Sequence, residues 1–262
     1  MPADNFADLA GKVAIITGSG RENGIGAAIA RTLARNGVSV TINHVSEDTA
    51  VRATELAQSI RDEYGVGVAL VQTDISTPEG ARTIVTETLR QLGVDHVDIL
   101  VNNAGNATAS SLMDVDLEKL QKTFDVNVYG PVFLTQTVVG LGKMPRGGRI
   151  INIGSIGSRT FPPLLPTYAA AKAATDVLTV LWAGELGRSH GITVNTIAPG
   201  PIVTDIIENS PDTFESLCLL QRGSDQVGVP QHIADVVLLI ASEKSHWLTG
   251  KYLAADAGIT GN

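Results

Sequence analysis

The sequence has little cysteine, no excess of positive charge and no long apolar run. Cys218 is the one cysteine among 262 residues, which excludes an intramolecular disulfide and favours a reducing compartment. The formal net charge of −8 at pH 7 opposes binding to a nucleic-acid backbone. The longest apolar run, 236–241, is too short to span a membrane, and residues 1–9 lack the pattern of a signal peptide. We therefore expect a soluble cytoplasmic protein that binds neither nucleic acid nor membrane.

Apolar residues and glycine are abundant. Hydrophobic residues make up 44% of the chain, and a chain of this length buries roughly 70–75% of its unfolded surface, so it needs no disulfide or structural metal to fold. The 27 glycines follow no collagen-like period, so most of them mark turns. The length indicates one domain over residues 1–262.

Short β-branched runs alternate with longer helical patterns. Strands are expected at 13–17, 38–43, 66–73, 97–101, 149–153, 192–197 and 251–254. Helices are expected at 24–36, 46–64, 79–92, 116–141, 167–190 and 231–242, the second with Ser46 as N-cap. The strands are apolar on both faces, which is typical of a parallel sheet covered on both sides. We predict an α/β fold: a single doubly wound Rossmann domain whose central parallel sheet of about seven strands binds ligands at the carboxyl ends of its strands.

A glycine-rich loop joins the first expected strand to the first helix. It reads Thr17-Gly18-Ser19-Gly20-Arg21-Glu22-Asn23-Gly24-Ile25-Gly26. Glycines allow a sharp turn and let the backbone approach a pyrophosphate, which then rests on the positive end of the helix. The position between a strand and a helix favours a dinucleotide site over an ordinary turn.

Together with this loop, a second motif after the fourth strand, Asn102-Asn103-Ala104-Gly105, resembles the short-chain dehydrogenase/reductase family. The resemblance extends from Gly11 to Gly258 and is greatest to 3-oxoacyl-carrier-protein reductases and fungal-type reductases of polyketide or hydroxynaphthol ketones. The chain departs from the family where five residues, rather than three, separate Gly18 and Gly24. We interpret Glu22-Asn23 as a two-residue insertion, which leaves the direction of Arg21 open.

The end of the second strand carries no acidic residue. An NAD site typically places Asp or Glu there, on the ribose hydroxyls, whereas this chain reads Asn43-His44-Val45-Ser46. Arg21 would pair with an adenosine 2′-phosphate, and Asn43, His44 and Ser46 would donate hydrogen bonds to it. We therefore predict NADP(H) rather than NAD(H). The alternative is that Ser46 only caps a helix and that Arg21 is a solvated loop charge.

The resemblance implies further cofactor contacts along the same edge of the sheet. Asp74 corresponds to the residue at the adenine edge, whereas Asp98 is expected to be structural. The segment after the sixth strand corresponds to the one whose backbone touches the nicotinamide. The implied cofactor-binding residues are Gly18, Ser19, Arg21, Gly24, Ile25, Gly26, Asn43, His44, Ser46, Asp74, Ile75, Asn103, Ala104, Gly105, Tyr168, Lys172, Pro199, Gly200, Ile202 and Thr204.

Tyr168 and Lys172 are four residues apart in an expected helix, so they share one face. An ammonium near a phenol favours the phenolate and lowers a pKa that starts at about 10, as proton transfer near neutral pH requires. Ser155 follows the fifth strand, 13 residues before Tyr168, and Asn127 lies in an otherwise helical stretch. The resemblance implies that these four residues form the catalytic set.

The implied reaction is hydride transfer between C4 of a nicotinamide and a carbonyl carbon, with proton transfer between Tyr168 and the carbonyl oxygen. Ser155 would hydrogen-bond that oxygen, Lys172 would hold the nicotinamide ribose, and Asn127 would anchor a water relay. No metal is expected, because no histidine has the spacing of a ligand. The histidines are His44, His96, His190, His232 and His246.

The substrate is expected to contact residues 156–166 and a lid at about 205–221. These segments are rich in apolar residues, and their arginines, Arg159 and Arg222, are isolated. These segments favour an apolar pocket, and the resemblance to ketoreductases implies that the substrate is an apolar ketone, either β-ketoacyl or polyketide-like. The alternatives are an NAD-dependent alcohol or sugar dehydrogenase and, from a different class, a catalytically silent NADP-binding regulator. A homo-oligomer, tetramer or dimer, is expected through helices 116–141 and 167–190.

Overall fold

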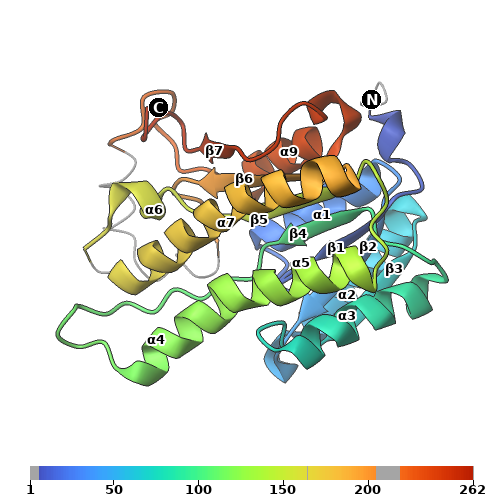
Figure 1. Cartoon of the computed structure of the whole chain (residues 1–262), viewed down its shortest axis with the longest axis horizontal. Coiled ribbons are helices and arrows are strands. Elements are labelled where there is room, and N and C mark those ends of the chain that lie inside the picture. Colours follow the sequence, from blue (N-terminus) through green and yellow to red (C-terminus); the bar gives the residue numbers. More distant parts are fainter. Residues whose placement is uncertain (1–5, 164, 205–218, 262) are drawn as a thin grey trace.

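The computed structural model describes residues 6–163, 165–204 and 219–261 (Figure 1). Most of the expected lid, 205–218, and the expected substrate residue Leu164 lie outside the described residues. Among the described residues, no helix combines the length and the apolar character that crossing a bilayer requires.

Within the described residues, seven parallel strands form one sheet in the order β3-β2-β1-β4-β5-β6-β7. The strands are β1 (Val13–Ile16), β2 (Ser39–His44), β3 (Val68–Gln72), β4 (Ile99–Asn102), β5 (Arg149–Ile153), β6 (Thr193–Pro199) and β7 (Tyr252–Ala255). The chain order reverses between β1 and β4, which is where such sheets bind ligands. The predicted doubly wound α/β fold is confirmed.

Helices cover both faces of the sheet (Figure 1). On one face the core includes residues from α1 (Ile25–Arg35), α2 (Ala50–Tyr64) and α9 (Pro230–Ala241). On the other face it includes residues from α3 (Pro78–Leu92), α5 (Gly130–Gly140) and α7 (Pro166–His190). The short helix α6 (Gly157–Thr160) lies next to α7.

The two cores explain why the strands are apolar at every position. In β1, Ala14 and Ile16 belong to the core on the α1 side, whereas Val13 and Ile15 belong to the core on the α3 side. Successive side chains of a strand point to opposite faces, so both faces need apolar residues. Each fully buried isoleucine contributes about 1.5–3 kcal/mol to stability.

Two of the expected helices are interrupted. The helix expected at 46–64 begins as a 3-10 turn, η2 (Glu47–Thr49), before α2. Ser46 is the N-cap residue of η2, as predicted, but its side chain makes no capping hydrogen bond; its hydroxyl lies 3.3 Å from that of Thr49. The helix expected at 116–141 consists of α4 (Leu117–Phe124), a π-helical turn η3 (Asp125–Tyr129) and α5.

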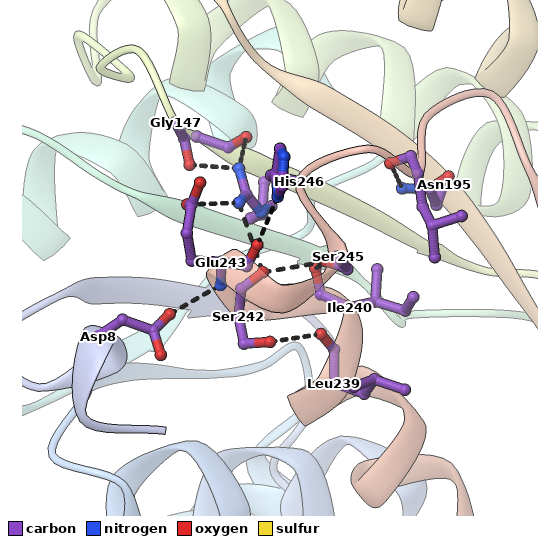
Figure 2. Close-up of polar contacts among 12 residues, drawn as sticks. Asp8, Gly147, Asn195, Leu239, Ile240, Ser242, Glu243, Ser245 and His246 are labelled. Atoms are coloured by element: carbon purple, nitrogen blue, oxygen red, sulfur yellow. Dashed lines mark hydrogen bonds and ion pairs between the residues drawn. The ribbon is translucent and has the colours of Figure 1, made fainter. Parts of the chain in front are cut away.

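A cluster of hydrogen-bonded polar groups at the amino ends of the strands joins β5 to the segment after α9 (Figure 2). Arg149 is only 2% exposed, and its guanidinium donates to the carbonyls of Gly147 at 2.7 Å and Ser242 at 3.4 Å and to Glu243 at 3.0 Å. The backbone N–H of Glu243, in η4 (Glu243–Ser245), donates to Asp8 at 2.7 Å. Buried charge of this kind is tolerated only when it is hydrogen-bonded.

Replacing Arg149 with Met is expected to lower the free energy of unfolding by about 2–3 kcal/mol, because buried carbonyl oxygens lose charge-assisted hydrogen bonds. Chemical denaturation measures the change. The matched control is Glu243→Gln: its side chain is 62% exposed, so less than about 1 kcal/mol should be lost. Equal losses of unfolding free energy in the two variants would show that only the ion pair with Glu243, and not the hydrogen bonds to the buried carbonyls, contributes to stability.

Candidate active site

The glycine loop between β1 and α1 packs against the segment that follows β4. Gly18 has a φ of +61°, and a Cβ there would lie 2.8 Å from the Cα of Ala104. At Gly26 a Cβ would lie 2.6 Å from Nδ2 of Asn103, which donates to the carbonyls of Thr17 and Gly18. Only glycine fits at these two positions. Because these glycines lack side chains, the loop packs directly on the segment after β4 and forms a glycine-walled cradle that leads into the N-terminus of α1, where unpaired N–H groups favour an anion. The residues therefore fit a dinucleotide pyrophosphate.

Of three buried side chains predicted to bind cofactor, Asn43 and Ser19 instead hold the loop to the end of β2, and His44 bonds to the segment that follows this strand. Asn43 accepts from the N–H of Gly18 at 3.1 Å and donates to the carbonyl of Thr73 at 3.1 Å. Ser19 is fully buried, and its hydroxyl accepts from the N–H of Asn43 at 3.0 Å. His44 is buried as well, with Nδ1 3.2 Å from the carbonyl oxygen of Ser46. Their polar groups face inward rather than toward a cofactor.

Arg21 differs from these three residues because it is exposed, and within the described part of the chain its guanidinium makes no hydrogen bond or ion pair. The neighbouring Glu22 lies 3.8 Å from Arg31 on α1. Of the residues predicted to meet a 2′-phosphate, Arg21 and the half-buried Ser46 are the ones whose side chains remain near the surface.

The predicted adenine-edge residues lie at the end of β3. Asp74 is exposed, and its carboxylate accepts from the N–H of Ser76 at 2.9 Å. Ile75 is buried against Gly130, where a Cβ would lie 2.4 Å from its Cδ1. Asp74 is therefore accessible to a ligand, whereas the side chain of Ile75 is part of the core.

Tyr168 and Lys172 lie on one face of α7 at the carboxyl end of β5, and Ser155 joins them from the segment that follows this strand. The Nζ atom of Lys172 donates to the carbonyl of Ile153 at 2.8 Å and lies 5.7 Å from the ring centroid of Tyr168. The side chain of Ser155 is close enough to that of Tyr168 to lower its pKa, and its Oγ accepts from the N–H of Gly157 at 3.0 Å. Side chains from α7 and from the segment after β5 thus lie together at the carboxyl end of the sheet.

Burial has opposite effects on the two titrating groups. Desolvation lowers the pKa of Lys172 to about 8, and the charge of Asp176 opposes this shift. Desolvation raises the pKa of Tyr168, and the side chain of Ser155 opposes that rise. The expectation that the pKa of Tyr168 falls is therefore wrong for this structure, because burial has the largest effect and Lys172 is not among the groups that lower the pKa. Burial thus favours the protonated phenol.

Asn127 lies in the π-helical turn η3, and such turns often occur at functional sites. Its Nδ2 donates to the carbonyls of Asn106 at 2.7 Å and Thr123 at 2.8 Å, while its Oδ1 is buried and accepts no hydrogen bond from the described residues. A Cβ built on Gly105 would lie 3.2 Å from this Oδ1 and 3.7 Å from Nζ of Lys172. An orphaned acceptor beside an ammonium fits a bound water or a ligand hydroxyl.

The segment after β6 also reaches this edge of the sheet. Gly200 lies so close to Asp256 that a Cβ would be 2.7 Å from its Cα. Ile202 is buried in the core and forms a parallel bridge with Gly228, so its backbone rather than its side chain is left to face a ligand. Thr204 is half-buried at the end of the described segment.

An apolar hollow of about 360 Å³ lies beside α6 and the start of α7. It is lined by Ser158, Phe161, Pro162, Pro163, Pro166, Ala169, Ala170 and Ala173. A Cβ built on Gly157 would lie 3.1 Å from Oγ of Ser155 and 3.7 Å from Pro162, so the hollow adjoins the segment that carries Ser155. A larger hollow of about 510 Å³ lies between α3 and α5. None of the four catalytic candidates lines either hollow, and the smaller one is the one that adjoins Ser155.

The guanidinium of Arg159, which is exposed, stacks 3.5 Å above the ring of Tyr252. Arg222, the other isolated candidate, packs against Gly258 and Gly261.

Sequence reasoning missed Asp176, which lies one helical turn beyond Lys172 and influences its pKa. The spacing of four residues was the available signal, since it places the two side chains on one helical face.

Comparison with known proteins extends over nearly the whole chain. Residues 18–260 match the family profile described as Enoyl-(Acyl carrier protein) reductase. Short-chain dehydrogenase/reductase FrzI of a Cladobotryum species is 36% identical over 259 residues, with 96% of each chain covered. The 3-oxoacyl-(acyl-carrier-protein) reductase FabG of Vibrio cholerae is 35% identical over 252 residues, covering 96% of this chain and 98% of FabG.

Solved structures agree with these matches. A blue fluorescent protein from a metagenomic library, in complex with NADPH, superimposes with a TM-score of 0.89 at 37% identity, covering 96% of this chain and 98% of that one. The angucycline C-6 ketoreductase LanV with bound NADP has a TM-score of 0.89 at 32% identity, with 97% of each chain covered.

Proposed function

Since the chain belongs to the short-chain dehydrogenase/reductase family, we propose that this oxidoreductase is an NADPH-dependent carbonyl reductase acting on an apolar ketone, with Tyr168 as proton donor. The observation that carries the proposal is the convergence of Ser155, Tyr168 and Lys172 beside the glycine-walled cradle. A regulator that only binds a dinucleotide has no need of a protonated phenol at this position.

The bound dinucleotide would supply the hydride. Gly18, Gly26 and the N-terminus of α1 would hold its pyrophosphate, and Lys172 would hold the hydroxyls of its nicotinamide ribose. The hydroxyls of Ser155 and Tyr168 would both meet the carbonyl oxygen, where negative charge develops as the carbonyl is reduced.

Tyr168 would donate its proton to that oxygen, and the ammonium of Lys172 would stabilise the phenolate that remains. The orphaned Oδ1 of Asn127 lies near Lys172 and would accept a hydrogen bond from a water that returns protons from solvent.

The choice of NADP(H) rests on charge at the end of β2. No acidic residue occupies 43–46, so a 2′-phosphate meets no repulsion there, and the exposed guanidinium of Arg21 has no partner in the described residues. Two similar proteins, the blue fluorescent protein and LanV, were solved with NADPH and NADP respectively. Asn43 and His44, whose polar groups face inward, are withdrawn from the proposed phosphate contacts.

Replacing Arg21 with Ala is expected to weaken NADPH binding about ten- to a hundred-fold, because a charge-assisted hydrogen bond is worth about 1.5–3 kcal/mol. The affinity for NADH, which lacks the 2′-phosphate, should not change. Fluorescence titration with each nucleotide measures both affinities. Arg82→Ala on α3 removes the same charge elsewhere and serves as the control, which should leave both affinities unchanged. An equal loss of affinity for NADPH and NADH in Arg21→Ala would show that Arg21 does not bind the 2′-phosphate.

An apolar ketone suits the hollow at α6 and α7, which consists mainly of proline, alanine and phenylalanine side chains. Curated relatives include a 3-oxoacyl-(acyl-carrier-protein) reductase and an L-xylo-3-hexulose reductase, both named for reduction of a carbonyl. Carbonyl reduction is therefore the reaction class that we propose.

A substrate panel tests the function directly. Purified protein with NADPH or NADH is assayed against β-ketoacyl thioesters, quinones, aromatic ketones, a ketohexose and an enoyl thioester, following loss of reduced-nucleotide absorbance. Turnover of a ketone with NADPH is the expected result. Turnover of the enoyl thioester alone would contradict carbonyl reduction, a large preference for NADH would contradict the cofactor choice, and tight NADPH binding without turnover would favour the regulator.

The proposal includes assembly into a dimer or tetramer. Val177, Val180 and Leu181 on α7 are each at least 57% exposed, and Leu117 on α4 is 66% exposed. Exposed apolar surface of this kind is typical of an interface. A monomeric mass in light scattering at micromolar concentration would argue against it.

A further inference from the structure

Asp176 is a half-buried carboxylate one helical turn beyond Lys172 on α7. Its Oδ2 accepts from the hydroxyl of Ser158 at 2.7 Å. Its Oδ1 faces the end of β5, where a Cβ on Gly154 would lie 3.3 Å from it. The carboxylate is therefore directed into the protein beneath the site and not toward solvent.

Ser158 connects this carboxylate to the backbone of a catalytic residue. Its hydroxyl lies 2.9 Å from the carbonyl oxygen of Ser155 as well as 2.7 Å from Asp176. The same carbonyl accepts from the hydroxyl of Tyr252 on β7 at 3.4 Å. Asp176 on α7 and Ser155 after β5 are thus joined through one side chain.

The charged and titratable groups around Asp176 come from three elements. Lys172 on α7, Arg159 on α6 and Tyr252 on β7 each interact electrostatically with Asp176. Burial raises the pKa of Asp176, and Arg159 and Lys172 both oppose that rise. Tyr168 and Asp176 each lie one turn from Lys172 on the same helical face. The charge of Asp176 opposes the lowering of the Lys172 pKa by burial, without an ion pair of 4 Å or less between the two side chains.

Building on the proposed function, we propose that Asp176 is a positioning residue for the reaction: its carboxylate keeps Lys172 charged and, through Ser158, fixes the backbone of Ser155. A buried ammonium is costly unless an opposite charge compensates it. The ammonium of Lys172 also stabilises a phenolate on Tyr168. Asp176 would therefore set the pH range of the reaction through Lys172, although its carboxylate does not contact the substrate.

The first test needs no cofactor. In protein labelled at the lysine ε-carbon, the resonance of Lys172, assigned with a Lys172→Arg variant, is followed by NMR across pH. Wild-type Lys172 should titrate at about pH 8. Asp176→Asn keeps a partner for Ser158 but removes the charge, so the midpoint should fall by about one pH unit. Asp62→Asn, on the surface of α2, is the control and should leave it unchanged.

The second test uses turnover of a ketone found in the panel. When kcat is plotted against pH, the decline on the alkaline side should begin about one pH unit lower in Asp176→Asn than in wild type. Ser158→Ala breaks the connection to Ser155 without removing charge. In that variant kcat should fall several-fold, but the pH at which it declines should not change. This difference separates the electrostatic role from the mechanical one.

An unchanged Lys172 midpoint in Asp176→Asn would overturn the inference, as would identical, pH-independent losses in the two variants. If Asp176→Asn does not fold, Asp176→Ser removes the same charge with a smaller side chain. It should shift the midpoint of the Lys172 titration by the same amount. If wild-type protein reduces no ketone, the proposed function fails, while the NMR titration still decides whether Asp176 controls Lys172.

Discussion

Replacing Tyr168 with Phe is expected to lower kcat for ketone reduction about a hundred- to ten-thousand-fold, because the substitution removes only the hydroxyl that donates the proton. The hydroxyl lies near that of Ser155, and burial raises the pKa of Tyr168 above its ordinary value. Stopped-flow or steady-state kinetics on the best ketone of the panel measure the loss. NADPH affinity should change little, since the ring remains in place.

Tyr64→Phe, on α2, is the matched control because it removes the same atom away from the site. It should retain full activity. Full turnover by Tyr168→Phe would refute the proposed proton donor. Loss of activity together with loss of folding, judged by circular dichroism, would instead indicate a structural role for the hydroxyl.

The pKa directions also determine how reduction depends on pH. Tyr168 must be protonated to donate, and its raised pKa keeps it so well above neutral pH. Lys172 loses its charge at about pH 8, so reduction should decline above that pH, before Tyr168 itself ionises. Alcohol oxidation needs the phenolate and should instead increase with pH.

Gly18→Ala is expected to weaken NADPH binding at least a hundred-fold. A methyl at this position would lie 2.8 Å from the Cα of Ala104 and 3.2 Å from its N. Both atoms belong to the backbone, so the loop or the segment after β4 must move. The proposed pyrophosphate site is formed by this loop and the N-terminus of α1, so it would be displaced as well. Isothermal titration calorimetry with NADPH measures the change.

Gly93→Ala is a closely matched control. Gly93 has a φ of +65°, nearly that of Gly18, but no atom lies within 4 Å of its missing Cβ. Both variants should lose about 1–2 kcal/mol of stability from the left-handed backbone. Only Gly18→Ala should also lose affinity for NADPH. If the two variants bind NADPH equally well, the cradle is not where the pyrophosphate binds.

Local pattern was sufficient to predict most of the fold. The alternation of apolar runs and amphipathic stretches predicts the seven strands and most of the helices, because a two-sided parallel sheet needs apolar residues throughout each strand. The spacing of Tyr168 and Lys172 likewise predicts their shared face, because helical geometry is local. The position of the glycine loop follows from the strand before it and the helix after it.

Properties that depend on contacts across the chain could not be predicted. Asn43 was expected to face a phosphate and Ser19 to bind the cofactor, but the two residues instead join the glycine loop to the second strand. The pKa of Tyr168 rises rather than falls because the fold buries the phenol. The π-helical turn around Asn127 interrupts a stretch whose residues read as a continuous helix.

The sequence by itself determined the order of elements, the glycine loop, the catalytic spacing and the lack of an acid at the end of β2, because each depends on neighbours along the chain. Only the tertiary structure decided which polar groups remain available to a ligand, how burial sets the protonation of Tyr168 and Lys172, and that Asp176 lies behind them. Hydrogen bonding and desolvation depend on which segments meet in space, and segments as distant as 43 and 73, or 155 and 252, meet only after folding.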